Sequence, residues 1–289
     1  MKNFLILILL ITGFVNAQIQ VGSTTLDERE VVNGLDVPWE IKWGPDSGNG
    51  EDFLWVTERP GLVSRINVET GEKHVILDIE SSVWDSNEAG LLGMEIHPDF
   101  NNGSPYVFLV YTYLSGGAKE KIVYYEYDSD ADQLINEVVL LDGLDGNSTH
   151  IGCRLMALND LTMLVTTGDA QDWDASQDIN ELTGKTLRMS IDIVGGTAGD
   201  APFDNPISGS LVWSSGHRNA QGLAIGPNGI IYSSEHGPSN DDELNILTPG
   251  ANYGWPNVQG YCDNQWVDYY YAGDLGGSYT ETDYCVDND

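Results

Sequence analysis

A weak internal repeat is the feature that most limits how this chain can fold. Four segments each place a turn rich in Gly, Asn, Asp or Pro before a short run of aromatic and aliphatic residues, and each run ends in polar residues. The segments are WGPDSGNGEDFLWVTERPG at 43–61, HPDFNNGSPYVFLVYTYLS at 97–115, LNDLTMLVTTGDA at 158–170 and GPNGIIYSSEHGP at 226–238. Their turns begin 53, 61 and 68 residues apart, which is the spacing of four-stranded propeller blades with long loops.

The rest of the sequence favours an all-β chain. No segment shows a sustained helical period, and 33 glycines suit a fold with many turns. Further strands are expected over 121–128 and 137–143. A β-sandwich is the structural alternative, but its repeating units would be shorter. We therefore predict a β-propeller with about four blades, in which the polar ends of the inner strands gather at one mouth of the central channel.

The N-terminus and the charge of the chain limit its location and its partners. The apolar run FLILILLI at 4–11 is too short to span a bilayer and precedes small residues suited to cleavage after Ala17. This pattern predicts a secretory signal peptide over 1–17 and a propeller domain over 18–289, and no later segment resembles a membrane span. The net charge of −33 repels nucleic acid and anionic membranes, so neither is an expected partner.

The three cysteines make no zinc-binding framework. Cys262 and Cys285 lie in the acidic C-terminal region, where they either form a disulfide in an oxidising compartment or remain thiols. Cys153 lies within an apolar run, which predicts a buried thiol.

Six motifs along the chain resemble those of a known family. In order they are LDVPWEIKWGPD, LWVTERPGLVSRI, GLLGMEIHPDF, GHRNAQGLAI, SEHGPSNDDELN and GANYGWPNVQGY. Over roughly residues 33–263 they resemble the soluble glucose/sorbosone (aldose sugar) dehydrogenases, which use pyrroloquinoline quinone (PQQ). The resemblance implies a six-bladed propeller, a secreted or periplasmic location, calcium, and oxidation of an aldose at C1 to the lactone. It also implies an external electron acceptor and a homodimer contact.

Two residues match family positions at the reacting sugar. His150 in STHIGCRL matches the catalytic histidine, which would take the proton of the C1 hydroxyl as hydride leaves for the quinone. Histidine suits this role because its unperturbed pKa, roughly 6.5, lies near the working pH. Glu88 in SNEAGLLG stands where the family carries Gln or Glu near sugar and quinone; a solvated loop carboxylate is the alternative. Thr149 is a departure, because an Asp that orients the histidine precedes it in the glucose-specific branch, so the second ring nitrogen has no evident partner.

The resemblance also places residues at the quinone. Arg218 and Asn219 match the pair that contacts it, and an arginine fork can donate hydrogen bonds to its carbonyl and carboxylate oxygens. The alternative for Arg218 is an ion pair at the end of a strand. Lys185 and Arg188 are further candidates for the carboxylates of the quinone.

Calcium ligands are implied at two places. Gly237 and Pro238 match positions whose backbone carbonyls hold the calcium ion that also binds the quinone, and carbonyl oxygens suit such a hard cation. A plain Gly-Pro turn is the alternative. Gln259, Tyr261 and Asp263 in VQGYCD match a second, structural calcium site near the dimer contact of the family.

Two other functions stay open at this point. A propeller of the same lineage that binds a partner without catalysis would be favoured by the loss of His150 or Arg218, and both are present. A calcium-dependent lactonase would need carboxylate and Asn ligands in the channel in place of the Gly-Pro carbonyls. Because about four repeat units are visible and six are implied, we also expect a C-terminally incomplete propeller with only part of the cofactor site.

Overall fold

A computed structural model describes residues 19–45, 53–262 and 281–287. The predicted signal peptide and Asp263 lie outside the described residues. Within these ranges the helical segments are α1 (Glu281–Asp287) and two short 3-10 turns, η1 (Phe100–Asn102) and η2 (Asp174–Ser176). None of the described helices is long and apolar enough to cross a membrane.

Strands that follow one another in the chain form four successive antiparallel sheets. The first comprises β3 (Pro38–Gly44), β4 (Phe53–Glu58), β5 (Leu62–Asn67) and β6 (Lys73–Asp78); the second β7 (Leu91–Ile96), β8 (Tyr106–Leu114), β9 (Ala118–Asp128) and β10 (Gln133–Asp145); the third β11 (Leu155–Ala157), β12 (Thr162–Thr166), β13 (Lys185–Ser190) and β14 (Val212–Ser215); the fourth β15 (Ala220–Ile225), β16 (Ile231–Glu235) and β17 (Glu243–Ile246). A small hairpin, β1 (Ile19–Val21) and β2 (Thr24–Leu26), precedes them.

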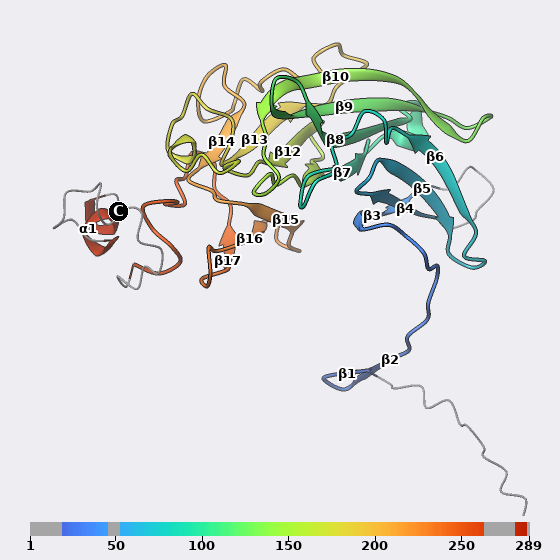
Figure 1. Cartoon of the computed structure of the whole chain (residues 1–289), viewed down its shortest axis with the longest axis horizontal. Coiled ribbons are helices and arrows are strands. Elements are labelled where there is room, and N and C mark those ends of the chain that lie inside the picture. The colour runs from blue at the N-terminus through green and yellow to red at the C-terminus, as the bar shows by residue number, and fades with distance from the viewer. Residues whose placement is uncertain (1–18, 46–52, 263–280, 288–289) are drawn as a thin grey trace, which may run out of the picture.

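The four sheets are arranged as the blades of a propeller. Figure 1 shows them following one another along an arc, from the blue first sheet to the orange fourth sheet. The first strands of the sheets, β3, β7, β11 and β15, contact one another in turn and are therefore the inner strands. Each of the four predicted repeats supplies the second strand of one sheet, β4, β8, β12 or β16. The blade prediction is thus confirmed, and the β-sandwich alternative is wrong.

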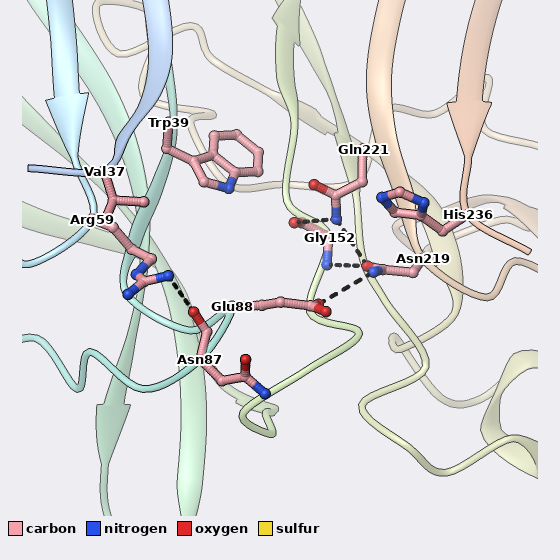
Figure 2. Close-up of a pocket in the computed structure, with 9 residues that line it drawn as sticks. All are labelled: Val37, Trp39, Arg59, Asn87, Glu88, Gly152, Asn219, Gln221 and His236. Atoms are coloured by element: carbon pink, nitrogen blue, oxygen red, sulfur yellow. Dashed lines mark hydrogen bonds between the residues drawn. The ribbon is translucent and has the colours of Figure 1, made fainter. Parts of the chain in front are cut away.

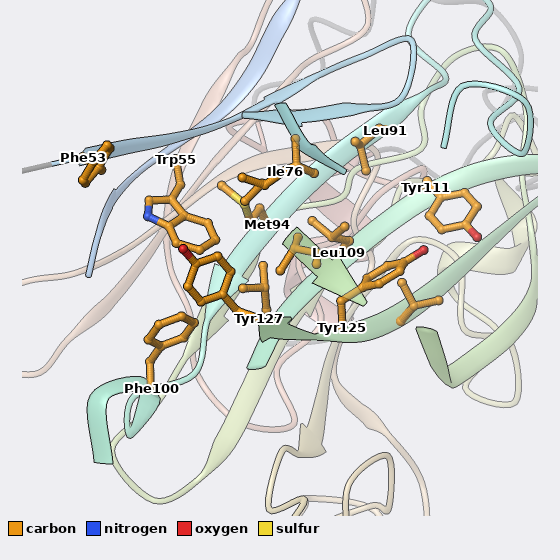
Figure 3. Packing of buried hydrophobic residues seen from close by; sticks show 14 residues of the cluster. Phe53, Trp55, Ile76, Leu91, Met94, Phe100, Leu109, Tyr111, Tyr125 and Tyr127 are labelled. Atoms are coloured by element: carbon orange, nitrogen blue, oxygen red, sulfur yellow. The ribbon is translucent and has the colours of Figure 1, made fainter. Parts of the chain in front are cut away.

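The core lies between neighbouring sheets, and β8 shows why its sequence is a continuous apolar run. Side chains alternate between the two faces of a strand. Leu109 therefore joins the cluster between the first and second sheets, which Figure 3 shows around Trp55. Val110, the next residue, joins the cluster between the second and third sheets. A strand covered on both faces needs apolar residues at every position, not at every second one.

The cysteines resolve the alternatives left by the sequence. Cys262 and Cys285 form a disulfide, which connects α1 to the segment that follows the fourth sheet. Cys153 is a free and buried thiol, as predicted.

Candidate active site

A pocket of about 220 Å³ lies where the inner strands begin. In an antiparallel sheet the first strand starts at the same end of the sheet at which the second strand finishes. Residues just before β7, β11 and β15 therefore meet residues just after β4 and β16. The pocket is lined by Val37, Trp39, Arg59, Asn87, Glu88, Gly152, Asn219, Gln221 and His236, so that all four sheets contribute to it (Figure 2).

His150 lies beside this pocket, on the segment that leads into β11. Its Nδ1 is 2.9 Å from Oδ1 of Asp169, a fully buried carboxylate that follows β12. The Asp169 carboxylate is itself held, because Trp255 Nε1 donates to Oδ2 at 2.9 Å and the backbone N–H of Gln171 donates to Oδ1 at 2.8 Å. A ring nitrogen that donates to a carboxylate fixes the tautomer. In the neutral imidazole the proton therefore lies on Nδ1, which leaves the lone pair on Nε2.

This pair corrects one expectation from the sequence. The second ring nitrogen of His150 does have a partner although Thr149 precedes it, because Nδ1 pairs with Asp169. In the sequence, Asp169 could have been singled out by its position, because it comes directly after the apolar run of the third repeat.

Glu88 lies at the tip of the turn before β7 and links three sheets. Its Oε2 accepts from the backbone N–H of His150 at 2.9 Å and from Nδ2 of Asn219 at 3.4 Å. Its own N–H donates to the carbonyl of Ser148 at 2.8 Å. His150 adopts a left-handed backbone with φ of 55°, a conformation that costs about 1 kcal/mol or more for a residue other than glycine. The hydrogen bond from Glu88 helps to hold that backbone in place.

Arg218 and Asn219 precede β15 and are fixed by one carboxylate. The backbone N–H groups of both residues donate to Oε1 of Glu235, and the distance from Asn219 is 3.2 Å. The guanidinium group of Arg218 lies 5.4 Å above the ring of Trp255 and donates to the carbonyl of His236 at 3.3 Å. Both predicted cofactor residues therefore stand at the mouth beside Glu88 and His150.

His217 supports this arrangement from within the core. It is fully buried, its Nδ1 lies 2.8 Å from Oε2 of Glu235, and its Nε2 lies 2.9 Å from the hydroxyl of Ser214. Its ring stacks on Tyr253 at a centroid distance of 4.7 Å. Both ring nitrogens are thus engaged, and His217 orients the carboxylate that holds Arg218.

Gly237 and Pro238 follow β16 at the same mouth. Among the residues that the structure describes, neither of their carbonyl oxygens accepts a hydrogen bond. A Cβ atom at Gly237 would overlap the carbonyl oxygen of Asn240, so this turn requires glycine. Two unengaged carbonyl oxygens are a donor set that suits calcium. Their metal-binding role stays a prediction.

The second predicted calcium site is described only in part. Gln259 is buried and its N–H donates to Oε1 of Glu281 at 2.9 Å, whereas the side chain of Tyr261 is 85% exposed. Asp263 lies outside the described residues. No group of three His, Cys, Asp or Glu side chains in the described part of the chain is placed to hold a metal ion. This site also stays a prediction.

Lys185 and Arg188 do not line the pocket at the mouth of the channel, contrary to the expectation from the sequence. Lys185 is completely buried, and burial lowers its pKa to about 8. Its ammonium group donates to three backbone carbonyls, those of Ala175 at 2.5 Å, Ser176 at 3.1 Å and Thr183 at 2.9 Å. Arg188 lies toward the other end of β13, where it pairs with Asp160 at 2.7 Å and Asp204 at 2.9 Å. Both are structural cations.

Several residues at the pocket were not singled out from the sequence. Arg59, and Asp169 as the partner of His150, each come shortly after the strand of one repeat, so their shared position was the available signal. Trp39 and Gln221 lie within inner strands and carried no such signal. One face of the Trp39 ring is covered by the guanidinium of Arg154 at 4.3 Å.

Comparisons with known proteins identify the lineage. The family model described as Glucose / Sorbosone dehydrogenase matches residues 35–273. The chain belongs to the glucose/sorbosone dehydrogenase family. It is 34% identical over 278 residues to quinoprotein glucose dehydrogenase B of Acinetobacter calcoaceticus, covering 86% of this chain and 56% of the relative. It is 28% identical over 242 residues to aldose sugar dehydrogenase YliI of Escherichia coli, covering 80% and 62%. The chain thus spans somewhat more than half the length of these curated relatives.

Solved structures of this family agree with the propeller assignment. The PQQ-bound form of the aldose sugar dehydrogenase from Streptomyces coelicolor superposes with a TM-score of 0.72 at 33% identity, covering 80% of this chain and 66% of that one. The apo-form of the soluble aldose sugar dehydrogenase from Escherichia coli gives a TM-score of 0.67 at 28% identity, covering 79% and 66%. The predicted family and fold are confirmed.

Proposed function

We propose that this chain provides the catalytic histidine and part of the cofactor site of a quinoprotein sugar dehydrogenase that oxidises an aldose at C1 to the lactone. The observation that carries the proposal is the His150–Asp169 pair at 2.9 Å, placed beside a pocket that contains Glu88 and Asn219. The chain spans 56% of one curated relative, so the activity of the whole relative is part of the proposal.

The geometry suits His150 to act as a general base. With Nδ1 held by Asp169, the lone pair on Nε2 can accept the proton of the C1 hydroxyl. The positive charge that then develops on the imidazole is stabilised by a buried carboxylate that Trp255 and Gln171 hold in place. No movement of Asp169 is needed during the proton transfer.

Glu88 has one carboxylate oxygen left for a ligand. Its Oε2 is occupied by His150 and Asn219, whereas Oε1 has no hydrogen-bond partner among the described residues. Because Glu88 is exposed and lines the pocket, Oε1 can accept a hydrogen bond from a sugar hydroxyl. This would orient C1 toward His150.

The residues present fit PQQ and calcium in part. Arg218 and Asn219 offer donors for carbonyl and carboxylate oxygens, and Gly237 and Pro238 offer carbonyl oxygens for a calcium ion. When bound, the quinone supplies the acceptor for the hydride that leaves C1. The chain would then pass electrons to an external acceptor. Secretion, the acceptor and a homodimer remain proposals that rest on the family resemblance.

The other two functions are less well supported. The family model and two of the curated relatives carry dehydrogenase names, which favours this reaction over a lactonase. A binding module would not need a histidine whose tautomer is fixed by a buried carboxylate, so the His150–Asp169 pair favours catalysis.

The test is quinone binding followed by turnover. The purified chain is titrated with PQQ with and without calcium, and binding is followed by the absorbance of the quinone. Aldoses are then added and the reduction of a dye is recorded. Calcium-dependent binding and aldose-dependent bleaching of the quinone are expected. Calcium-dependent binding without bleaching by any aldose would refute the dehydrogenase and favour a binding module.

A further inference from the structure

Glu88 lies at the tip of a tight turn formed by residues 85–90. Ser86 and Ala89 exchange two backbone hydrogen bonds across it, at 3.1 and 3.0 Å. Asn87 takes a left-handed backbone with φ of 62°. A turn of this length cannot bury its own side chains, so its position must be fixed from outside.

Arg59, which directly follows β4, contacts this turn at several points. Its Nε donates to Oδ1 of Asp85 at 2.7 Å, and its Nη1 donates to the carbonyl of Asn87. Its own carbonyl accepts from the N–H of Leu91 at 2.7 Å. A Cβ atom at Gly90 would overlap the Arg59 side chain, so the arginine also packs directly on the backbone of the turn.

On its other side the turn is connected to the third and fourth sheets. Glu88 accepts from the backbone N–H of His150 and from Asn219. Figure 2 shows Glu88 reaching across the pocket, with Arg59 on one side and Asn219 on the other. Arg59 on the first sheet is thereby joined to His150 on the third through Glu88.

We propose that Arg59 is the positioning residue for Glu88, and through Glu88 for the backbone of His150. A guanidinium group is a rigid planar fork, so one side chain can hold the Asp85 carboxylate and the Asn87 carbonyl together. The Arg59 and Asp85 side chains are 23% and 33% exposed, so solvent screens their charges and the pair contributes chiefly through its geometry. The effect of Arg59 on turnover rests on the proposed function, whereas its effect on the position of Glu88 does not.

The backbone N–H of His150 reports on this arrangement without any cofactor. Hydrogen exchange is measured on the full chain. Arg59→Gln should raise the exchange rate at His150 by about tenfold or more, the scale expected for losing a charge-assisted hydrogen bond. Amides of β12 should keep their rates. Glu88→Ala should give the same increase at His150, and adding Arg59→Gln to that variant should give no further increase there.

Matched variants separate positioning from loss of charge and from misfolding. Arg29→Gln removes the same charge from an exposed pair with Glu69 at 3.7 Å and should leave the His150 exchange rate unchanged. Arg59→Lys keeps a cation for Asp85 without the fork and should give an intermediate rate. If Arg59→Gln does not fold, Asp85→Asn still tests the proposal, because it weakens the hold on the turn and leaves Arg59 in place.

Two results would overturn the proposal. One is an unchanged exchange rate at His150 in Arg59→Gln; weaker PQQ binding in the same variant would then make Arg59 a ligand contact. The other is an equal increase over β4, β5 and β6, which would mean general loosening of the first sheet. In the protein loaded with PQQ and calcium, Arg59→Gln should also lower kcat. Calcium-dependent quinone binding without bleaching by any aldose would refute the proposed function, while the exchange data would still decide the role of Arg59.

Discussion

Replacing Glu120 by glutamine should make the folded chain more stable, by an amount that grows with pH. Glu120 lies on β9 and is 1% exposed, within the core between the second and third sheets. Its Oε2 lies 3.6 Å from Sγ of Cys153, and its Oε1 has no hydrogen-bond partner among the residues that the structure describes. Burial raises the pKa of Glu120 to about 8, so the folded chain keeps the carboxyl protonated at neutral pH.

The magnitude follows from proton linkage. The carboxyl has a pKa of 4.5 when solvated, as it is in the unfolded chain. At pH values between 4.5 and about 8, the unfolded chain has released the proton of this carboxyl, whereas the folded chain retains it. The free energy of unfolding therefore falls by about 1.4 kcal/mol per pH unit, reaching a loss of up to about 5 kcal/mol near pH 8 and no further loss above it.

The assay is urea unfolding of the unmodified chain and of Glu120→Gln between pH 5 and pH 9. Glutamine resembles the protonated acid in shape and cannot ionise. The difference in unfolding free energy should be under about 1 kcal/mol at pH 5 and should grow to as much as about 5 kcal/mol at pH 8. Glu126→Gln, at a half-buried position on the same strand, is the control and should show no such growth. A difference for Glu120→Gln that stays flat from pH 5 to pH 8 would refute the reasoning.

Three further predictions concern the site. His150→Ala should leave PQQ binding largely intact and lower kcat by roughly a hundredfold or more, the usual scale for a lost general base; near-normal turnover would remove His150 from the mechanism. Asp169→Asn should also lower kcat strongly with little change in PQQ affinity, because the amide no longer fixes the tautomer of His150; a selective loss of binding would contradict this reading. Chelation of calcium should release the quinone, with magnesium restoring it poorly because that ion demands a tighter octahedron than the carbonyls of Gly237 and Pro238 would give. Binding that persists after exhaustive chelation would argue against that metal site.

The fold was predictable because a propeller blade is a local structure. Each sheet joins strands that are consecutive in the chain, so the turn and the apolar run of a blade stand side by side in the sequence. The meeting of Glu88, His150 and Asn219 was predictable for a related reason. Each lies just before an inner strand, and the inner strands begin at one mouth.

The pairing of individual side chains was not predictable in the same way. In the sequence, Asp169 and Arg59 look like ordinary polar residues at the ends of strands. The neighbouring sequence does not show that Asp169 contacts His150 or that Arg59 contacts the turn that carries Glu88. Such contacts depend on the angle between neighbouring blades, which is set by packing across whole sheets. The reading of Lys185 as a cofactor residue failed because the sequence does not show the backbone carbonyls that surround its ammonium group.

Burial of Lys185 changes how this acidic chain can hold an anionic cofactor. The net charge is −33, so the long-range field opposes the approach of a quinone that carries carboxylates. With Lys185 and Arg188 committed to structural partners, the cationic side chains at the mouth are Arg218 and Arg59 within the described residues. Each missing charge-assisted hydrogen bond weakens binding by about 1.5–3 kcal/mol, so two of them lower affinity by roughly a hundredfold to ten-thousandfold. A calcium ion on the carbonyls of Gly237 and Pro238, as proposed, would supply positive charge without a side chain. This carbonyl turn would therefore matter more to quinone binding here than in a chain whose lysines face the mouth.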